Sequence, residues 1–343
     1  MNMRRRDIVL GVGVLAIGGA SAVPAIARSR DPVAQAALDL LESLDPDQRR
    51  RVVHGFDDPD RRDWHYTPRS RPGLALRDMN DGQRELVFRL LRTVLSEQGT
   101  RKADQVILLE GILGEITGNT GFRDPENYAV VIFGDPAGGT PWAWRFEGHH
   151  LSLSFTVAPG TGIAATPAFL GTNPAVVRPG HQHAGLRVLN DEHDLAFGLV
   201  NGLAGAARET AILRPRSFGD ILTGPGREDS LRKPQGLPLG QMPDVLRGQA
   251  LKLIDSYLGN MAPAIAERET RDLRAAGLDN VHFAWAGSTT PDAGHYYRLH
   301  GPTVIIEYDN TRSGANHVHS VWHNPRDGFG ADLLRAHNER DHG

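Results

Sequence analysis

The chain has 343 residues, 38 Lys and Arg against 41 Asp and Glu, a formal charge of −3 at pH 7, 15 histidines and no cysteine. The lack of cysteine excludes disulfides, thiolate metal sites, iron–sulfur clusters and a Cys nucleophile. The nearly balanced charge, without a basic tract, makes nucleic acid and anionic lipid unexpected as partners. Any metal must therefore be bound by nitrogen and oxygen, and the histidines are the candidate nitrogen ligands.

The N-terminus has the pattern of an export signal. Three arginines at 4–6 precede the apolar run 8–17, and the small-residue sequence Ala-Ile-Ala follows at 25–27. This order is that of a cleaved signal peptide, and an arginine pair before a weakly apolar run is typical of twin-arginine export. An ordinary signal for the general secretion route is the alternative. We expect the twin-arginine machinery to export the protein and residues 1–27 to be removed. Residues 28–343 would then be a single periplasmic or secreted domain without a membrane anchor.

The first part of the mature chain is predicted to be helical. Apolar residues recur at helical spacing in 32–41, and Asp45 followed by Pro46 is typical of an N-cap with proline at the first helical position. Amphipathic patterns predict two more helices, over 80–98 and 102–116. Strands are then predicted by apolar runs and by strict alternation, at 128–133 and 151–157.

The second part of the chain begins with helices and ends with strands. Helical patterns occupy 186–213, 245–258 and 262–276, and strand patterns occupy 281–286, 296–299, 303–308 and 317–322. The loop-rich stretch 214–243 is expected to wrap the surface or cover a site. The sequence therefore predicts an α+β fold, with N-terminal helices packed on a largely antiparallel sheet that includes a C-terminal hairpin. No internal repeat is apparent.

The strongest candidate ligands lie in the sequence NHVHSVWH at 316–323. If this stretch is a strand, His317 and His319 share one face and can converge on a metal ion. Glu307 lies on the preceding strand, and one residue of slip in the hairpin register decides which face it shares. Glu307 is then either a third ligand or general base, or a carboxylate that orients a ligand or pairs with Arg298.

A second histidine pair, His149 and His150, precedes the alternating strand at 151–157. Adjacent residues of a strand point to opposite faces, so only one of the two is expected at a given site unless Gly148 marks a bulge. A buried, hydrogen-bonded core histidine is the alternative for His149. The H-x-H at His181 and His183 falls between glycines and prolines, where solvated loop histidines are expected.

Several stretches carry a resemblance to a known family over roughly residues 36–337. They include Trp64-His65-Tyr66, Phe133-Gly134-Asp135-Pro136, Trp144 to Ser152, Thr166 to Gly171, Tyr297 to Pro302 and His317 to Trp322. Together they resemble the domain of unknown function 3500 family of secreted bacterial and fungal proteins. The resemblance implies that the histidines at 149, 150, 317 and 319 and the acid at Glu307 are family features. It leaves the reaction open.

The sequence thus favours a metal-dependent hydrolase acting on a small substrate, which can be anionic. One divalent transition metal, with zinc preferred over copper or iron, would be bound by His317, His319 and one or both of His149 and His150, and would lower the pKa of a bound water to about 7. Arg145 and Arg298 would hold negative charge. A copper or non-haem iron oxidoreductase and a non-enzymatic binding protein are the alternatives.

Overall fold

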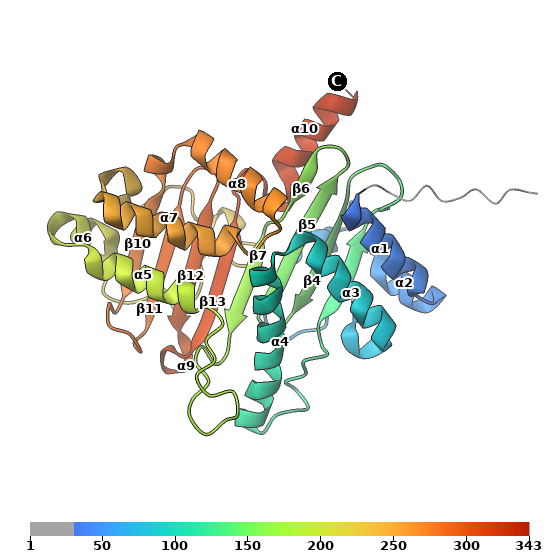
Figure 1. Cartoon of the computed structure of the whole chain (residues 1–343), viewed down its shortest axis with the longest axis horizontal. Helices are drawn as coiled ribbons and strands as arrows, with labels where there is room; N and C mark the ends of the chain where they lie inside the picture. Colours follow the sequence, from blue (N-terminus) through green and yellow to red (C-terminus); the bar gives the residue numbers. More distant parts are fainter. Residues whose placement is uncertain (1–30, 343) are drawn as a thin grey trace, which may run out of the picture.

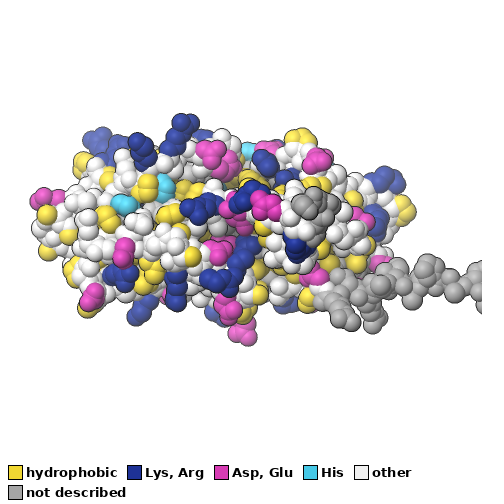
Figure 2. Space-filling model, turned by 90° about the horizontal axis from the view of Figure 1, so that it is seen from above, with side chains coloured by type: hydrophobic (Ala, Val, Ile, Leu, Met, Phe, Trp, Pro, Cys, Tyr) yellow, Lys and Arg dark blue, Asp and Glu magenta, His cyan; other side chains and the backbone are white. Residues whose placement is uncertain are grey.

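The computed structural model describes residues 31–342, which form the α+β fold that the sequence predicts (Figure 1). The predicted export signal at 1–27 lies outside the described residues. No helix within 31–342 combines the length and apolar character needed to cross a membrane. Acidic and basic side chains are interspersed on the face seen in Figure 2.

The strands form one sheet of thirteen. In chain order they are β1 (Val53–His54), β2 (Leu74–Ala75), β3 (Ala129–Phe133), β4 (Trp142–Gly148), β5 (Leu151–Ala158), β6 (Gly162–Ala164), β7 (Ala168–Thr172), β8 (Ile212–Arg214), β9 (Leu237–Pro238), β10 (His282–Gly287), β11 (His295–His300), β12 (Ile305–Thr311) and β13 (His317–His323). They lie in the order β1-β3-β4-β5-β7-β13-β12-β11-β10-β8, while β2, β6 and β9 pair with β3, β5 and β10. Among the described pairs, β1·β3 and β8·β10 are parallel and the others antiparallel.

The helices are α1 (Pro32–Ser43), α2 (Pro46–Val52), α3 (Asp81–Val94), α4 (Glu97–Thr117), α5 (Asn190–Gly202), α6 (Gly205–Ala211), α7 (Asp244–Leu258), α8 (Pro263–Ala276), the short α9 (Arg312–Ala315) and α10 (Ala331–His342). The predicted cap at Asp45 is confirmed, because its carboxylate accepts from the backbone N–H groups of Asp47 and Gln48, each at 2.8 Å. Helices α1, α3, α4, α5, α7 and α8 lie over one face of the sheet (Figure 1).

The two faces of the sheet have different chemistry. Alternate strand residues facing the helices are apolar or aromatic and form the main core with the helices, as with Trp144, Leu153 and Trp322. The other face carries buried polar side chains, among them Arg145, Glu147, Ser152, His319, Glu307 and Arg298. Two long loops, 55–73 and 215–236, contact these polar side chains. We call them the first and second covering loops.

The order of elements is repeated within the chain. Residues 32–172 run α1-α2-β1-β2-α3-α4 and then four main strands, β3, β4, β5 and β7, beside the short β6. Residues 190–323 run α5-α6-β8-β9-α7-α8 and then β10, β11, β12 and β13. We call these stretches the first and second halves. They meet at the antiparallel pair β7·β13, the seam, which lies in the middle of the sheet.

Residue pairing supports the equivalence of the halves. Leu74 pairs with Val130 in the first half, and Leu237 pairs with Phe283 in the second. The two short strands lie within Gly-Leu-x-Leu-x-x-Met, which occurs at 73–79 and again at 236–242. The expectation of no internal repeat was therefore wrong. The repeat is easily missed because it retains few residue identities, whereas the pairing of strands is kept.

Candidate metal centre

The two adjacent histidines do not lie on a strand, contrary to the sequence-based expectation. His149 and His150 form the two-residue turn between β4 and β5. His150 adopts a positive φ of 62°, which lets the two rings lie against each other with centroids 3.7 Å apart. The turn begins at Gly148, where a Cβ atom would lie 2.1 Å from Cδ1 of Tyr128. The hairpin turn, rather than strand alternation, therefore decides where each imidazole points.

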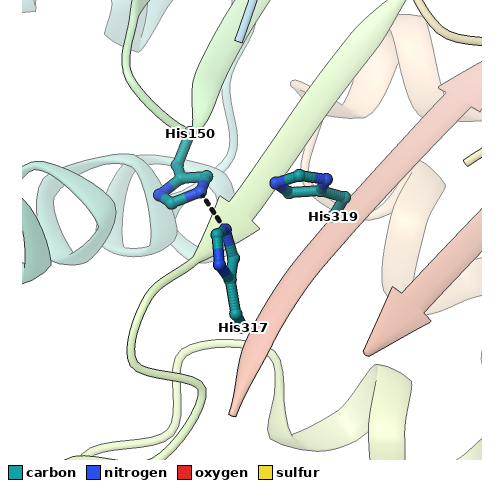
Figure 3. Close-up of side chains that lie close together, drawn as sticks. All are labelled: His150, His317 and His319. Carbon is teal, nitrogen blue, oxygen red and sulfur yellow. Dashed lines mark hydrogen bonds between the residues drawn. The ribbon is translucent and has the colours of Figure 1, made fainter. Parts of the chain in front are cut away.

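Three imidazoles converge at the end of the seam (Figure 3). Nε2 of His150 lies 2.8 Å from Nε2 of His317. The ring centroids of His317 and His319 are 4.8 Å apart. One nitrogen from each of the three lies within 4.8 Å of the others, as ligands of a single ion would. His150 comes from the first half, whereas the other two come from β13 of the second.

Gly171 of β7 lets the two halves bring these rings together. It pairs with His319 across the seam, and its N–H donates to the carbonyl of His150 at 2.7 Å. A Cβ atom at this position would lie 2.7 Å from the carbonyl oxygen of Val318 and 2.9 Å from the ring of His150. A side chain here would therefore displace either the seam or a candidate ligand.

Both covering loops reach His319. Asp220 of the second covering loop lies with Oδ1 2.6 Å from Nδ1 of His319, while the ring of Tyr66 from the first covering loop lies 4.8 Å from the imidazole. The hydroxyl of Tyr66 also donates to Asp220, at 3.3 Å, and Arg312 pairs with the same carboxylate at 2.8 Å. A carboxylate on Nδ1 fixes the tautomer and leaves Nε2 free to bind a metal, as in many carboxylate–histidine–metal sites.

Two of the cluster histidines, His150 and His317, are held in the neutral form, which is the form that binds metals. Burial, followed by the neighbouring histidines, lowers the pKa of His150 well below its usual value. The same causes lower the pKa of His317 to about 3. At neutral pH both rings therefore have a lone pair available without first losing a proton.

His149 is separated from the three-histidine group by its own partners. Nδ1 of His149 lies 2.5 Å from Oε2 of Glu110, and the guanidinium of Arg123 lies 3.0 Å from the same nitrogen. Glu110, His149 and His150 are also close enough to bind one ion. The cation of Arg123 already lies beside that group, which disfavours a metal there. The structure therefore brings His150 into the candidate centre and places His149 next to it.

Glu307 is not directed at the cluster. It shares the face of His319, but it pairs with Val321, two residues further along β13. Its fully buried carboxylate accepts from the backbone N–H groups of Leu222 and Thr223, each at 2.8 Å, from the Thr223 hydroxyl and from the hydroxyl of Tyr296 at 2.5 Å. With both oxygens occupied, Glu307 is placed to hold the second covering loop.

Arg145 and Arg298 occupy equivalent positions in the two halves, and each is 1% exposed. Nη1 of Arg145 donates to the carbonyl of Asp60 at 2.7 Å, and Nη2 of Arg298 donates to Oε1 of Gln235 at 2.6 Å. Asp60 and Gln235 belong to the first and second covering loops. The structure thus shows these arginines bound to the loops, and it does not bring either of them to the histidine cluster.

Three further histidines have local partners. Nε2 of His181 lies 3.0 Å from Glu115, Nδ1 of His193 lies 2.8 Å from Asp194, and Nε2 of His323 lies 2.8 Å from the carbonyl of Thr223. The tryptophans at 142, 144 and 322 lie in the main core on the helix side of the sheet. The candidate centre is on the opposite face.

Sequence reasoning missed Asp220 and the site role of Tyr66. Asp220 lies 99 residues from His319, so no spacing pattern connects them. Its position in a Gly- and Pro-rich stretch expected to cover a site is the one signal that pointed toward it. Tyr66 falls in the Trp-His-Tyr stretch at 64–66, which carried part of the family resemblance but suggested no chemistry.

The chain matches the model of a known protein family. Residues 27–331 match the family described as Protein of unknown function (DUF3500). The match covers most of the chain, which therefore belongs to this family, as the resemblance of its sequence stretches implied. Neither the curated proteins nor the solved structures include a match to this chain.

Proposed function

We propose that this DUF3500 protein is a metal-dependent enzyme that binds one divalent transition metal through His150, His317 and His319. The convergence of these three imidazoles, with nitrogens within 4.8 Å of one another, carries the proposal. Zinc suits a three-histidine set with a fourth, open position. Asp220 supports His319 from behind, as an outer carboxylate does in such centres.

The reaction that suits this arrangement best is hydrolysis. A zinc ion held by these three histidines would act as a Lewis acid and would lower the pKa of a bound water to about 7. Low pKa values at His150 and His317 keep these side chains as ligands rather than as proton donors. In this scheme Glu307 and the two buried arginines shape the site from a distance, by holding the covering loops in place. Secretion through the predicted signal would place the enzyme in the periplasm or outside the cell.

A copper or iron oxidoreductase is the second candidate, and one contact favours it. The ring of Tyr66 lies 4.8 Å from that of His319, and its hydroxyl donates to the Asp220 carboxylate that supports this histidine. A phenol so close to a metal ligand is suited to electron transfer. Three histidines without a cysteine ligand accommodate copper or non-haem iron as well as zinc.

Elemental analysis of the exported protein tests the metal and chooses between these reactions. Wild type is compared with the double variant His317→Ala/His319→Ala, and with His181→Ala/His183→Ala as a matched H-x-H control in a loop. We expect nearly one metal per chain in wild type and control, and its loss in the first variant. Zinc would direct the work to hydrolytic assays, and copper or iron to redox assays. Metal-free wild type, or equal metal content in all three proteins, would contradict the proposal.

A further inference from the structure

A pocket of about 670 Å³ lies beside the histidine cluster. Its walls are the C-terminal end of α4, the loop 173–189 that follows β7, and the α9 turn before β13. Asn173 of the loop lines the pocket, and its Nδ2 lies 3.4 Å from Nδ1 of His317. His150 and His319 are buried, whereas His317 is partly exposed. A molecule from solvent therefore has its access to the cluster at His317, the histidine that the pocket adjoins.

The pocket is formed before any ligand binds, because the loop 173–189 is bonded on two sides. Nδ1 of His181 accepts from the N–H of His183 at 3.1 Å, so the proton of the neutral ring is on Nε2, which lies 3.0 Å from Oε2 of Glu115 on α4. On the other side, Oδ1 of Asn316 accepts from the N–H of Val176 at 2.8 Å. A site with fixed walls loses less conformational freedom when a ligand binds.

Apolar side chains form much of the pocket wall. They come from α4 and from the loop, and they are Leu113, Ile116, Pro174, Val176 and Pro179. Ile116 is 54% exposed and Val176 is 38% exposed, although both are large and apolar. Single exposed apolar residues are ordinary, but a group of them around one hollow is typical of a binding site. A ligand with an apolar part would remove these surfaces from water.

The charges of the lining favour a ligand with a carboxylate. Glu115 and Arg178 are the charged side chains of the lining, and Glu115 already accepts from His181. Arg178 is exposed, and no residue within 31–342 pairs with it. A guanidinium can bind a carboxylate through two parallel hydrogen bonds. Arg178 could therefore hold the negative charge that the sequence assigned to Arg145 and Arg298, which are occupied by the covering loops.

We propose that this pocket binds a small carboxylic acid with an aliphatic or aromatic tail, with the carboxylate on Arg178 and the tail against Ile116 and Val176. As a substrate subsite, the pocket rests on the proposed function: the substrate of the metal centre would carry such a group, held next to His317. The binding itself requires no metal.

Titration calorimetry on the exported protein after chelator treatment tests the pocket without direct binding of a carboxylate to a metal. The probes are hexanoate and phenylacetate, with hexanamide and phenylacetamide as uncharged counterparts and acetate as the acid without a tail. Arg178→Gln removes the cation and Ile116→Ser removes part of the apolar wall. Both side chains are exposed, so the fold should be kept. Arg101→Gln and Val245→Ser are matched controls, because these side chains are also exposed but lie outside the pocket.

We expect both acids with a tail to bind wild type and the two controls, and acetate to bind at least about tenfold more weakly. Arg178→Gln should weaken the binding of the acids about threefold to fivefold and leave that of the amides unchanged. Ile116→Ser should weaken acids and amides alike, by about fivefold.

Three results would overturn the proposal: no binding of either acid, amides that bind wild type as tightly as the acids, or unchanged affinity in Arg178→Gln or Ile116→Ser. The metal content of the untreated protein is a separate result. Acids that bind a protein which never contains metal would support the site and overturn its role as a substrate subsite.

Discussion

Each half of the sheet holds its covering loop with a buried glutamate, but the two glutamates lie on different strands. In the first half, Glu147 of β4 accepts from the N–H of His65 at 2.8 Å. In the second half, Glu307 of β12 accepts from two backbone N–H groups of its loop. The strand pairing places His300 at the position equivalent to Glu147, and Ser154 at the position equivalent to Glu307. The two halves therefore share a structural requirement rather than the residues that meet it.

The buried arginines show the opposite behaviour. Arg145 and Arg298 keep the same position in both halves, and each donates to the loop that covers it. A guanidinium has five donors, so it can hold an irregular loop through carbonyls in one half and a side-chain amide in the other. The covering loops in turn deliver Tyr66 and Asp220 to the same histidine. The candidate centre thus depends on both halves being folded and paired at the seam.

The equivalent glycines before β2 and β9 provide the largest expected effect. Gly73 and Gly236 have φ values of 96° and 100°, and a Cβ atom on either would lie 2.2 Å from a carbonyl oxygen, that of Val130 or Phe283. Gly73→Ala and Gly236→Ala should each lower the free energy of unfolding by about 3 kcal/mol or more, through backbone strain and steric overlap. Urea denaturation measures both losses.

The comparison of the halves predicts that these two losses are similar. Gly180→Ala is a useful control, because this loop glycine also has a positive φ, 103°, but has open space around its Cβ position. It should show the conformational strain without the overlap, and hence a smaller loss. A large loss at one strand glycine and little at the other would break the structural equivalence of the halves.

The two glutamates are expected to differ. Glu147 lies among buried cations, with Arg71 at 3.1 Å and Arg145 at 3.1 Å, whereas Glu307 accepts from neutral donors. Glu147→Gln leaves buried positive charge unpaired and should cost about 3–5 kcal/mol. Glu307→Gln replaces one acceptor oxygen by a donor and should cost about 1.5–3 kcal/mol. Urea denaturation of the two variants gives the values.

The same variants distinguish a structural Glu307 from a catalytic one. If Glu307 acts by holding its loop, Glu307→Gln should keep most of its metal and lose activity only in proportion to the change in loop order, which limited proteolysis within 215–236 would detect. Unchanged stability and proteolysis together with a large loss of turnover would instead make Glu307 a catalytic residue.

Much of this fold follows from the sequence because its signals are local. Apolar spacing predicted α1, α7 and α8, and the alternation of Leu151 to Val157 predicted β5. What the sequence could not provide was the relation between the halves. Strand partners more than 100 residues apart, such as Gly171 and His319, leave no local pattern. The two halves share the order in which their strands pair but only a few identical residues. The duplication is therefore recognised from the pairing of strands in the sheet and not from the sequence.

The candidate site was predictable only where its residues are close together in the sequence. His317 and His319 are two residues apart on one strand, so their shared face follows from strand geometry. Choosing between His149 and His150 required the conformation of a two-residue turn, and strand alternation was the wrong rule for it. Glu307 was an attractive candidate by sequence proximity, but its carboxylate is already used by the loop of which Leu222 and Thr223 are part.

Asp220 offers a test of the contribution of the second covering loop to the centre. Asp220→Ala removes the carboxylate that lies 2.6 Å from His319, so the imidazole loses its fixed tautomer and orientation. Metal affinity should fall by about 10–100-fold, as is usual for such outer partners. Competition with a chelator of known affinity measures this change. Tyr66→Phe, which removes the corresponding hydroxyl from the first covering loop, should have a smaller effect, since its bond to Asp220 is 3.3 Å long. Equal losses would mean that both loops support His319 to the same extent.

The two halves are also expected to differ, by a smaller amount, in how much folding stability they lose at low pH. The position of Trp142 in the first half is taken in the second by His295, which is 1% exposed and stacked on Trp285 with centroids 5.4 Å apart. Burial lowers the pKa of His295 to about 4, whereas an unfolded histidine titrates near 6.5. The folded state thus binds fewer protons than the unfolded state between these values. Stability from this group is complete above pH 6.5 and is lost as the pH falls toward 4, by up to about 1.4 kcal/mol per unit.

An aromatic residue that does not titrate, placed at position 295, should remove this pH dependence of stability from the second half, as Trp142 does in the first. His295→Phe keeps a ring against Trp285 but binds no proton. Its free energy of unfolding should therefore fall less steeply than that of wild type between pH 6 and pH 5, by about 1 kcal/mol over that unit. His181→Phe, in the loop after β7, is the control for loss of a histidine. Only the slopes are compared, since His295→Phe also loses the contact of Nδ1 with the carbonyl of Ala293 at 2.8 Å. Parallel slopes for wild type and His295→Phe would place the acid sensitivity elsewhere, and the histidines of the seam would be the next to test.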